Sequence, residues 1–577
     1  MSEMERVMGS SQGAMSGPTS YADPGFSRFL RRAFLAAEGF DDVDLDRPVV
    51  GIATTVSDFN PCHRDVPAVV EAVKRGVLQA GALPMVFPTM SLGETFINPT
   101  SMFLRNLMAM ETEELIRCQP MDAVVLIGGC DKTVPAQAMA AISAGIPALL
   151  EVVGPMLTNS WRGERVGACT DCRRMWGRFR AGELDQREIT EVQGSLATTS
   201  GTCMVMGTAS TMACLVAVLG LMELSGATAP SPSGDRLRHA LTTGRLAGEY
   251  ARASTSPTPT LTAASVQNAA KVLAALGGST NAVVHLVAIA RRAGLDLTVR
   301  DLDDALSSIP LLVDLKPSGT RYMEDFHQAG GLPVLLKALE SELDTSVMMA
   351  DGRTLKESLK DVSAPAAWQT VIHTLDDPIL PAPTLAVLTG TLAPDGAVLK
   401  VSSASPALLE HSGHVVVFDS PEDAEVRLDD PQLGITPDTV MILRNAGPIA
   451  AGMPEAGSLP IPRRLAEDGV RDMVRVSDGR MSGTSYGTVI LHCAPESAVG
   501  GPLAHVRDGD VVSLSVSRRR IDLLVDESEM ERRAATWDAT RDVPERGWGR
   551  LFAEHVQQSD KGADMDFLSA VQGGDGP

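Results

Sequence analysis

Three reactive side chains stand together after one apolar run of the chain. The segment MDAVVLIGGCDKT reads as a strand that ends in two glycines and leads into Cys130, Asp131 and Lys132. Residues 133–144 have helical spacing with Pro135 in the first turn, so the three side chains are expected between a strand end and a helix N-terminus. A thiol, a carboxylate and an amine in that position predict a reactive site.

This position also predicts what the site binds. Open parallel sheets bind ligands outside the carboxyl ends of their strands, and free amide groups at a helix N-terminus favour anions. Gly128 and Gly129 are expected to let a ligand approach the backbone closely. A negatively charged substrate or a metal cluster with anionic ligands would suit the site. The alternative is a tight turn in which Cys130 is simply buried and Asp131 caps the helix.

Composition narrows the class of protein. The chain has 577 residues, of which 44% are hydrophobic, and this is enough for two or three sizeable domains. A net charge of −22 argues against a nucleic-acid-binding surface, which needs clustered Lys and Arg. No run of eighteen apolar residues and no signal-peptide core is present, so we expect a cytoplasmic enzyme without a membrane segment.

The composition of the chain and its pattern of apolar runs change along the sequence. Residues 1–24 are rich in Gly, Ser and Met and are predicted to be disordered. Over residues 25–380 apolar strands alternate with amphipathic helices, which indicates an α/β domain with a parallel sheet. A cluster of prolines near residue 380 marks a linker. Residues 381–577 contain short β-rich runs between Gly- and Asp-rich turns, and predict a smaller barrel-like domain that completes the active site.

Individual elements can also be predicted from periodicity. The predicted strands of the first domain span residues 49–55, 83–87 and 123–127, and its predicted helices span residues 65–79, 101–117, 133–144, 207–224, 263–275 and 280–293. The predicted strands of the second domain span residues 384–388, 415–418, 440–443, 473–476, 488–492 and 511–516. From residue 527 onward the chain is charged and ends in GGDGP, and a loose tail is predicted there.

Eight motifs, taken in order, resemble one enzyme family. They are NPCH, SLGE, GGCDKT, SGTC, GGSTNA, LKPSG, GMPEAG and SDGRMSGT, and with the texture around them they cover residues 48–526. One such motif would be a weak signal, but eight in order are a strong one. The chain resembles the dihydroxy-acid and sugar-acid dehydratases, a family that also includes phosphogluconate dehydratase.

The resemblance implies an iron–sulfur cluster held by Cys62, Cys130 and Cys203. Three thiolates would leave one iron open to act as a Lewis acid on a substrate hydroxyl. Cys169 and Cys172 form a CxxC pair without a second pair at zinc spacing, and the role of Cys169 stays open. The cysteines expected instead in the apolar core are Cys118, Cys172, Cys214 and Cys493.

The resemblance also implies a magnesium ion beside the cluster. Its ligands would be Glu94, Asp131, Glu455 and Lys132, the last carboxylated because an ammonium group cannot bind a metal. For Glu94 and Glu455 the alternative is a helix cap or a surface charge. For Lys132 it is a simple ion pair with Asp131.

Catalysis by such an enzyme needs a base for the C2 proton of a 2,3-dihydroxy acid. Ser482 matches the family's base, an alkoxide whose pKa must be lowered by nearby cations, and Lys132 shares the catalytic centre. Thr484 and His63 are expected to contact the substrate, and His327 is a further candidate. The alternatives are a turn hydroxyl for Ser482 and structural hydrogen bonds for the histidines.

Substrate and assembly follow from the subgroup. Segments such as CTDCRRMWG are closest to the pentonate and hexonate dehydratases, which act on arabinonate or xylonate. That subgroup implies a 2Fe-2S cluster, a sugar-acid substrate and a homodimer or homotetramer. One alternative is a dihydroxy-acid dehydratase of branched-chain amino-acid biosynthesis. The other is a non-catalytic iron–sulfur sensor, which would not need Ser482, Glu94 or Glu455.

Overall fold

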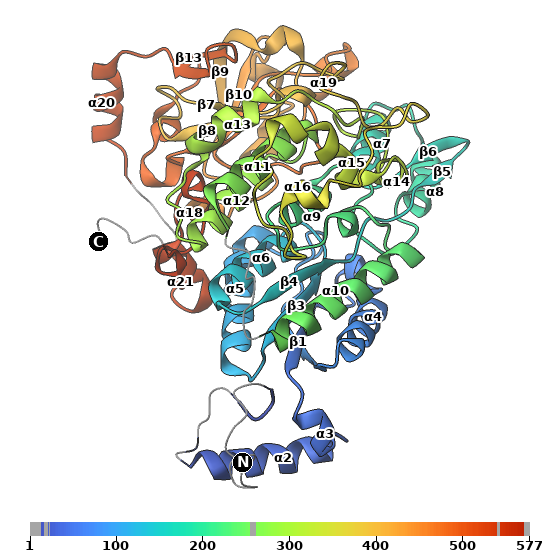
Figure 1. The fold of residues 1–577 in the computed structure, drawn as a ribbon. Coiled ribbons are helices and arrows are strands. Elements are labelled where there is room, and N and C mark those ends of the chain that lie inside the picture. Colours follow the sequence, from blue (N-terminus) through green and yellow to red (C-terminus); the bar gives the residue numbers. More distant parts are fainter. Residues whose placement is uncertain (1–12, 17–20, 22, 254–260, 539–542, 571–577) are drawn as a thin grey trace.

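The computed structural model describes residues 13–16, 21, 23–253, 261–538 and 543–570 (Figure 1). Most of residues 1–24, predicted to be disordered, lie outside this range. Among the described ones, Ala14 is buried and the Gly13 amide donates a hydrogen bond to Asp122. The helix α2 (Pro24–Ala37) then runs along the edge of the molecule, at the bottom of Figure 1.

The N-terminal part is built on a parallel four-stranded sheet. Its strands lie in the order β2-β1-β3-β4, and every pair is parallel. The strands are β1 (Val49–Thr54), β2 (Leu83–Pro88), β3 (Ala123–Gly128) and β4 (Ala148–Val152). The predicted parallel α/β domain is confirmed.

Helices cover both faces of this sheet because alternate strand residues point to opposite sides. Val50, Val125 and Leu149 pack against α4 (Val66–Gln79) and α10 (Gly234–Arg252). Their neighbours in the strands, such as Val124 and Leu150, belong to the core on the other face. That face is covered by α5 (Ser101–Cys118) and α6 (Thr133–Ala144).

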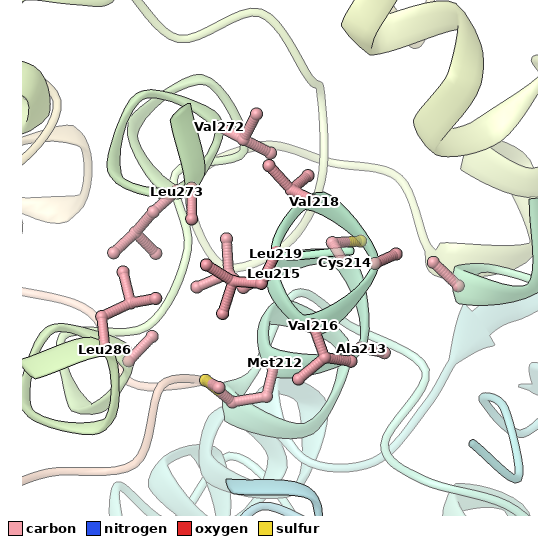
Figure 2. Close-up of a cluster of buried hydrophobic side chains, with 14 of the residues drawn as sticks. Met212, Ala213, Cys214, Leu215, Val216, Val218, Leu219, Val272, Leu273 and Leu286 are labelled. Carbon is pink, nitrogen blue, oxygen red and sulfur yellow. The ribbon is translucent and has the colours of Figure 1, made fainter. Parts of the chain in front are cut away.

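A second layer of apolar helices stands behind the sheet. Figure 2 shows α9 (Thr208–Val218) packed against α11 (Ala263–Ala275) and α12 (Asn281–Arg292). Every residue of α9 is buried, Cys214 among them. The helix is shorter than predicted, because Gly220 adopts a positive φ of 79° and the chain turns there.

The C-terminal part is built on eight strands in the order β14-β13-β9-β10-β11-β12-β8-β7. The four central strands, β9 to β12, are parallel, and the flanking pairs are antiparallel. A bridge between Thr389 and Arg520 joins the two edges, so the sheet is nearly closed, and the predicted barrel-like domain is confirmed. The strands are β7 (Ala386–Leu388), β8 (Gly396–Leu399), β9 (Glu410–Phe418), β10 (Val440–Leu443), β11 (Arg475–Ser477), β12 (Val489–Ala494), β13 (Val511–Ser515) and β14 (Arg520–Leu523).

The described residues from 527 onward, 527–538 and 543–570, are folded, and the prediction of a loose tail there was wrong. They form α20 (Glu527–Ala535) and α21 (Gly547–His555) and then return to the N-terminal part. The buried guanidinium of Arg105 donates to the carbonyls of Gly562 and Ala563, and Arg292 pairs with Asp564 at 2.5 Å. The last residues, 571–577, lie outside the described range.

The remaining helices and one short hairpin lie before, within and between these two parts. The other helices are α3 (Asp42–Leu45), α7 (Thr170–Arg180), α8 (Gln186–Leu196), α13 (Asp303–Ser308), α14 (Met323–Gln328), α15 (Gly331–Ala338), α16 (Leu355–Ser358), α17 (Pro421–Arg427), α18 (Pro448–Ala451) and α19 (Arg463–Glu467), and the short hairpin is β5 (Asn159–Trp161) with β6 (Glu164–Val166). Within the described part of the chain, no helix is both long and apolar enough to cross a membrane.

Candidate active site

Three carboxylates from distant parts of the chain meet where the two parts face each other. Glu94 follows β2, Asp131 follows β3, and Glu455 comes from the loop after α18. One oxygen of each lies within 4.8 Å of the others. The predicted metal ligands Glu94, Asp131 and Glu455 are therefore brought together. Neither Glu94 nor Glu455 is an isolated surface charge.

A buried arginine holds this group of carboxylates together. Arg480 donates to Glu455 at 2.6 Å and to Glu94 at 2.7 Å, although its own side chain is only 1% exposed. A further bond, at 2.8 Å, reaches the hydroxyl of Thr100. Arg480 lies in the SDGRMSGT motif of the C-terminal part, so this one guanidinium joins the barrel to the loop after β2.

Lys132 completes the charged group. Its side chain is fully buried, and Nζ lies 2.8 Å from Oδ2 of Asp131. Burial alone would raise the pKa of Asp131, but the charges of Lys132 and Arg480 outweigh it and hold that pKa below its usual value. Burial raises the pKa of Glu455, with the charges of Glu94 and Asp131 adding to the effect.

Two histidines in the same buried region have ring nitrogens without a partner among the described residues. They are Nε2 of His285 and both ring nitrogens of His492. Burial, together with the charges of Arg480 and Lys132, lowers the pKa of His492 to about 3, so the ring is neutral. Such unpaired buried nitrogens are costly and mark room for another polar group beside Lys132.

The donor set fits a hard divalent cation. Carboxylate oxygens are the ligands that Mg²⁺ prefers, and three carboxylates converge here around the buried guanidinium of Arg480. A carboxylated Lys132 would add an anionic oxygen and give the unpaired histidine nitrogens a polar neighbour. The ion would be held by Glu94, Asp131, Glu455 and modified Lys132.

Beside the carboxylates lies a group of thiols. Cys130 follows β3 with a positive φ of 66°, and Cys62 lies in a short 3-10 helix whose first amide is capped by Asn60. A hydrogen bond with Cys62, together with burial, raises the pKa of Cys130. The thiols of Cys62 and Cys130 also act on that of Cys203, whose pKa is raised. The three predicted cluster ligands are therefore neighbours.

A fourth thiol belongs to this group. Cys169, whose role was left open, lies at the N-cap of α7, and its Sγ is 2.8 Å from that of Cys203. Their shared hydrogen bond lowers the pKa of Cys169 and raises that of Cys203. The sequence signal was the CxxC pair, which gave no partner for either cysteine.

The remaining cysteines are mostly in the core, as predicted. Cys214 and Cys493 are buried, and Cys172 is partly buried beside Tyr322 and Met156. Cys118 is exposed at the end of α5, so the prediction that it is a core residue was wrong. It is the last residue of this helix.

The loop with the predicted base lies against the cluster segment. Ser482 Oγ is 2.8 Å from Thr484 Oγ1, and the backbone carbonyl of Thr484 accepts a hydrogen bond from Thr170, next to Cys169. A Cβ on Gly483 would lie 2.5 Å from Ser279 Oγ, so only glycine allows this close packing. Asn281 donates to the carbonyl of Met481. The GGSTNA and SDGRMSGT motifs thus hold Ser482 in place.

His63 has a structural role in this arrangement. It is buried; its Nε2 accepts the Gly129 amide at 2.8 Å, and Nδ1 lies 2.7 Å from Ser91 Oγ. The prediction that His63 contacts a substrate gains no support from these contacts. A Cβ on Gly129 would lie 2.3 Å from Val153, so this glycine serves close packing rather than ligand approach.

His327 is likewise engaged elsewhere. Its Nδ1 lies 3.1 Å from Thr228 Oγ1, and its Nε2 lies 3.3 Å from Asp235 at the start of α10. The other interpretation of Asp131, as a cap of α6, is also not observed. The N-cap is Lys132, and no side chain caps that helix.

Three functional candidates were missed in the sequence. Arg480 lies in the SDGRMSGT motif, two residues before Ser482. A buried arginine is needed there because three carboxylates converge. His285 follows GGSTNA on α12, and His492 lies on β12 at a register irregularity, with φ of 59°. Bulges of this kind re-aim side chains beside active sites, but they leave no mark in the sequence pattern.

Similarity to known proteins agrees with this site. The N-terminal model of the dihydroxy-acid/6-phosphogluconate dehydratases matches residues 47–358, and the C-terminal model matches residues 370–563. A 6-deoxy-6-sulfo-D-gluconate dehydratase of Pseudomonas putida is 44% identical over 93% of this chain and 94% of its own length. An L-arabinonate dehydratase of Rhizobium leguminosarum bv. trifolii is 42% identical over 94% of both chains.

A more distant relative is also similar to this chain over nearly its whole length. The dihydroxy-acid dehydratase of Thermosynechococcus vestitus is 34% identical over 94% of this chain and 97% of its own length. Every group described above, from Cys62 to Ser482, lies inside the matched segments. The chain therefore belongs to the dihydroxy-acid/6-phosphogluconate dehydratase family of hydro-lyases.

Proposed function

We propose that this enzyme dehydrates a sugar acid to a 2-keto-3-deoxy acid with the help of a 2Fe-2S cluster and Mg²⁺. The observation that carries the proposal is the contact between two kinds of donor. Cys130 Sγ, in the thiol group, lies 3.5 Å from an oxygen of Asp131, in the carboxylate group. Soft sulfur ligands suit iron and hard oxygen ligands suit magnesium, so adjacent residues serve two metals.

The two groups divide the reaction between them. When bound, the cluster and Mg²⁺ supply positive charge to the carboxylate and hydroxyl oxygens of the substrate. Ser482 Oγ takes the proton from C2, hydroxide leaves C3, and the enol tautomerises to the ketone. The Thr484 hydroxyl orients Ser482 across their 2.8 Å contact. Because serine is a poor base, the nearby positive charge must lower its pKa.

Lys132 enters the proposal in its carboxylated form. Carbon dioxide adds to the neutral Nζ with loss of one proton, which turns a cation into an anionic oxygen ligand. The position of the fully buried Lys132 near the unpaired ring nitrogens of His285 and His492 supports this change, because the added carboxylate would give them a polar partner. Arg480 then balances part of the added negative charge.

Similarity favours a sugar acid over a branched dihydroxy acid. The relatives named for sulfogluconate and arabinonate are 44% and 42% identical, against 34% for the dihydroxy-acid dehydratase. We also propose a homodimer or homotetramer in the cytoplasm, without a nucleic-acid partner. The net charge of −22 supports the last point.

The test is an assay of substrates with detection of 2-keto products. Anaerobically purified enzyme with Mg²⁺ is given L-arabinonate, D-xylonate, D-gluconate, 6-deoxy-6-sulfo-D-gluconate and 2,3-dihydroxyisovalerate. We expect turnover of at least one aldonate, and selective turnover of dihydroxyisovalerate would instead identify a branched-chain enzyme. Iron, sulfide and magnesium are measured in the same preparation.

A base variant tests the role of Ser482. We expect Ser482→Ala to lower kcat by about 10²–10⁴-fold, the range of general-base contributions. Ser485→Ala, in the same loop, is the matched control and is expected to keep most of the activity. Parental turnover by Ser482→Ala would refute the assignment.

A further inference from the structure

The four thiols of the site form two close pairs. Cys62 and Cys130 share a hydrogen bond, and Cys169 lies 2.8 Å from Cys203, sulfur to sulfur. The two pairs are neighbours, because the thiols of Cys62 and Cys130 both act on Cys203. The resemblance to the family accounts for three of these sulfurs and leaves Cys169 without a role.

In a 2Fe-2S cluster whose irons are both fully ligated by the protein, each iron takes two side chains. Two pairs of thiols match that arrangement, whereas three thiols leave one iron open. We propose that Cys169 is a fourth, displaceable ligand, which binds the iron held by Cys203 until the substrate hydroxyl replaces it. This inference rests on the proposed function, because it requires the cluster.

The geometry favours Cys169 as the labile member of its pair. Two thiolates on one tetrahedral metal, each about 2.3 Å from it, lie about 3.7 Å apart, so the observed 2.8 Å needs only a small separation. Cys169 lies at the helix N-terminus, where the dipole of α7 favours an anionic sulfur. It makes no side-chain capping bond that a shift would break.

The same segment is linked to the base loop. Thr170, the residue after Cys169, donates its hydroxyl hydrogen bond to the carbonyl of Thr484 at 3.1 Å. Thr484 in turn contacts Ser482. A substrate that engages Ser482 therefore acts on the start of α7, and release of the Cys169 sulfur accompanies assembly of the active form.

Cys172 supplies a matched control one turn along the same helix. It packs in the apolar cluster around Tyr322, and burial raises its pKa to about 12. Among the described residues it forms no hydrogen bond to another thiol. A serine at this position is expected to leave the cluster unchanged.

The main test is Mössbauer spectroscopy of iron-57 holoenzyme without substrate. Four sulfur ligands on each iron predict two alike ferric sites, whereas three thiolates leave one iron distinct. Addition of a turned-over aldonate is expected to make the two sites different. Distinct sites before substrate is added would overturn the proposal, and this measurement needs no variant.

Variants add an independent readout. Cys169→Ser is expected to keep two irons and two sulfides per chain but to shift the absorption and the EPR signal of the reduced cluster. It is also expected to lose iron in air several-fold faster than the parent or Cys172→Ser. Spectra and iron loss identical to the parent would overturn the role of Cys169.

Two other outcomes are distinguishable. If the parental enzyme binds no iron under anaerobic conditions, the proposed function itself fails. If peptide mapping finds a Cys169–Cys203 disulfide in the holoenzyme while the iron spectra match those of Cys169→Ser, the pair is a redox pair and not a ligand pair, and the inference is overturned.

Discussion

Two buried ionic groups of the molecule differ in their balance of charge. Arg236 on α10 and Glu151 on β4 pair at 2.7 Å, and both are almost fully buried. The second oxygen of Glu151 accepts from Thr243 at 2.6 Å, so one cation meets one anion. In the active site, three carboxylates meet the buried cations of Arg480 and Lys132, and a longer contact of 4.0 Å joins Glu455 to Arg173, whose side chain is 40% exposed.

We infer from this difference that the first group serves stability and the second serves function. A buried pair of one cation and one anion holds two elements together, and removal of one partner leaves the other charge buried and unpaired. An excess of carboxylates is costly to bury: burial raises the pKa of Glu455, and the charges of Glu94 and Asp131 raise it further against the opposing charge of Arg480. A fold keeps such an arrangement where a cation is to be bound, so imbalance identifies the functional group.

The largest expected effect is on the balanced pair. Arg236→Gln leaves Glu151 buried without its cation and is expected to lower the free energy of unfolding by about 3–5 kcal/mol. Urea unfolding followed by circular dichroism measures this, and activity per folded molecule should be unchanged. Arg238→Gln, at an exposed position on the same helix, is the control. A loss no larger than that of the control would show that the pair does not hold the fold.

A further buried carboxyl, that of Glu496, has no ion-pair partner among the described residues and sharpens the comparison. Glu496 accepts the amides of Ile449 and Ala450 at the start of α18, which leads to the loop of Glu455. Burial, with the charge of Asp478, raises its pKa to about 7.

Glu496 is therefore expected to make stability depend on pH. Between the ordinary value of 4.5 and about 7, the native state holds a proton that the unfolded chain has released. The free energy of unfolding should fall as the pH rises through this window, by up to about 3 kcal/mol. Unfolding curves at several pH values measure the slope, and Glu496→Gln should flatten it. An unchanged slope in that variant would assign it to another group.

The sequence predicted features that depend on neighbouring residues, but not contacts between residues far apart in the chain. Helices 133–144 and 263–275 and strand 440–443 were predicted with their observed limits, because local periodicity decides them. The position of Cys130 to Lys132 between a strand and a helix followed from the same pattern.

Long-range interactions were beyond that pattern. Arg480 reaches Glu94 across 386 residues, and the segment around Asp564 pairs with Arg292 across 272. In the sequence this segment is charged, and charged ends are usually solvated, so a loose tail was predicted. The close approach of Cys169 to Cys203 depends in the same way on the packing of α7, which no spacing encodes.

The next prediction removes the buried guanidinium that donates hydrogen bonds to both Glu94 and Glu455. Arg480→Gln is expected to lower kcat/KM at least about 100-fold, or about 2.7 kcal/mol, because Glu94 and Glu455 lose their shared donor. Its unfolding free energy should fall less than that of Arg236→Gln, since Mg²⁺ can replace the lost charge. Arg480→Lys, which keeps the charge without the fork, should lie between. A larger stability loss than in Arg236→Gln would reverse the comparison.

The smallest expected effect distinguishes the Arg236–Glu151 pair from the carboxylates of the active site most directly. Mg²⁺ at about ten times its Kd should raise the free energy of unfolding by about 1.4 kcal/mol, because the ion binds only the folded arrangement. Glu455→Gln should abolish this increment, whereas Arg236→Gln should keep it. The raised pKa of Glu455 means that a proton competes with the ion, so the increment should grow as the pH rises from the ordinary value of 4.5. Urea unfolding with and without MgCl₂ measures it, and an equal increment in Glu455→Gln would show that Mg²⁺ binds elsewhere.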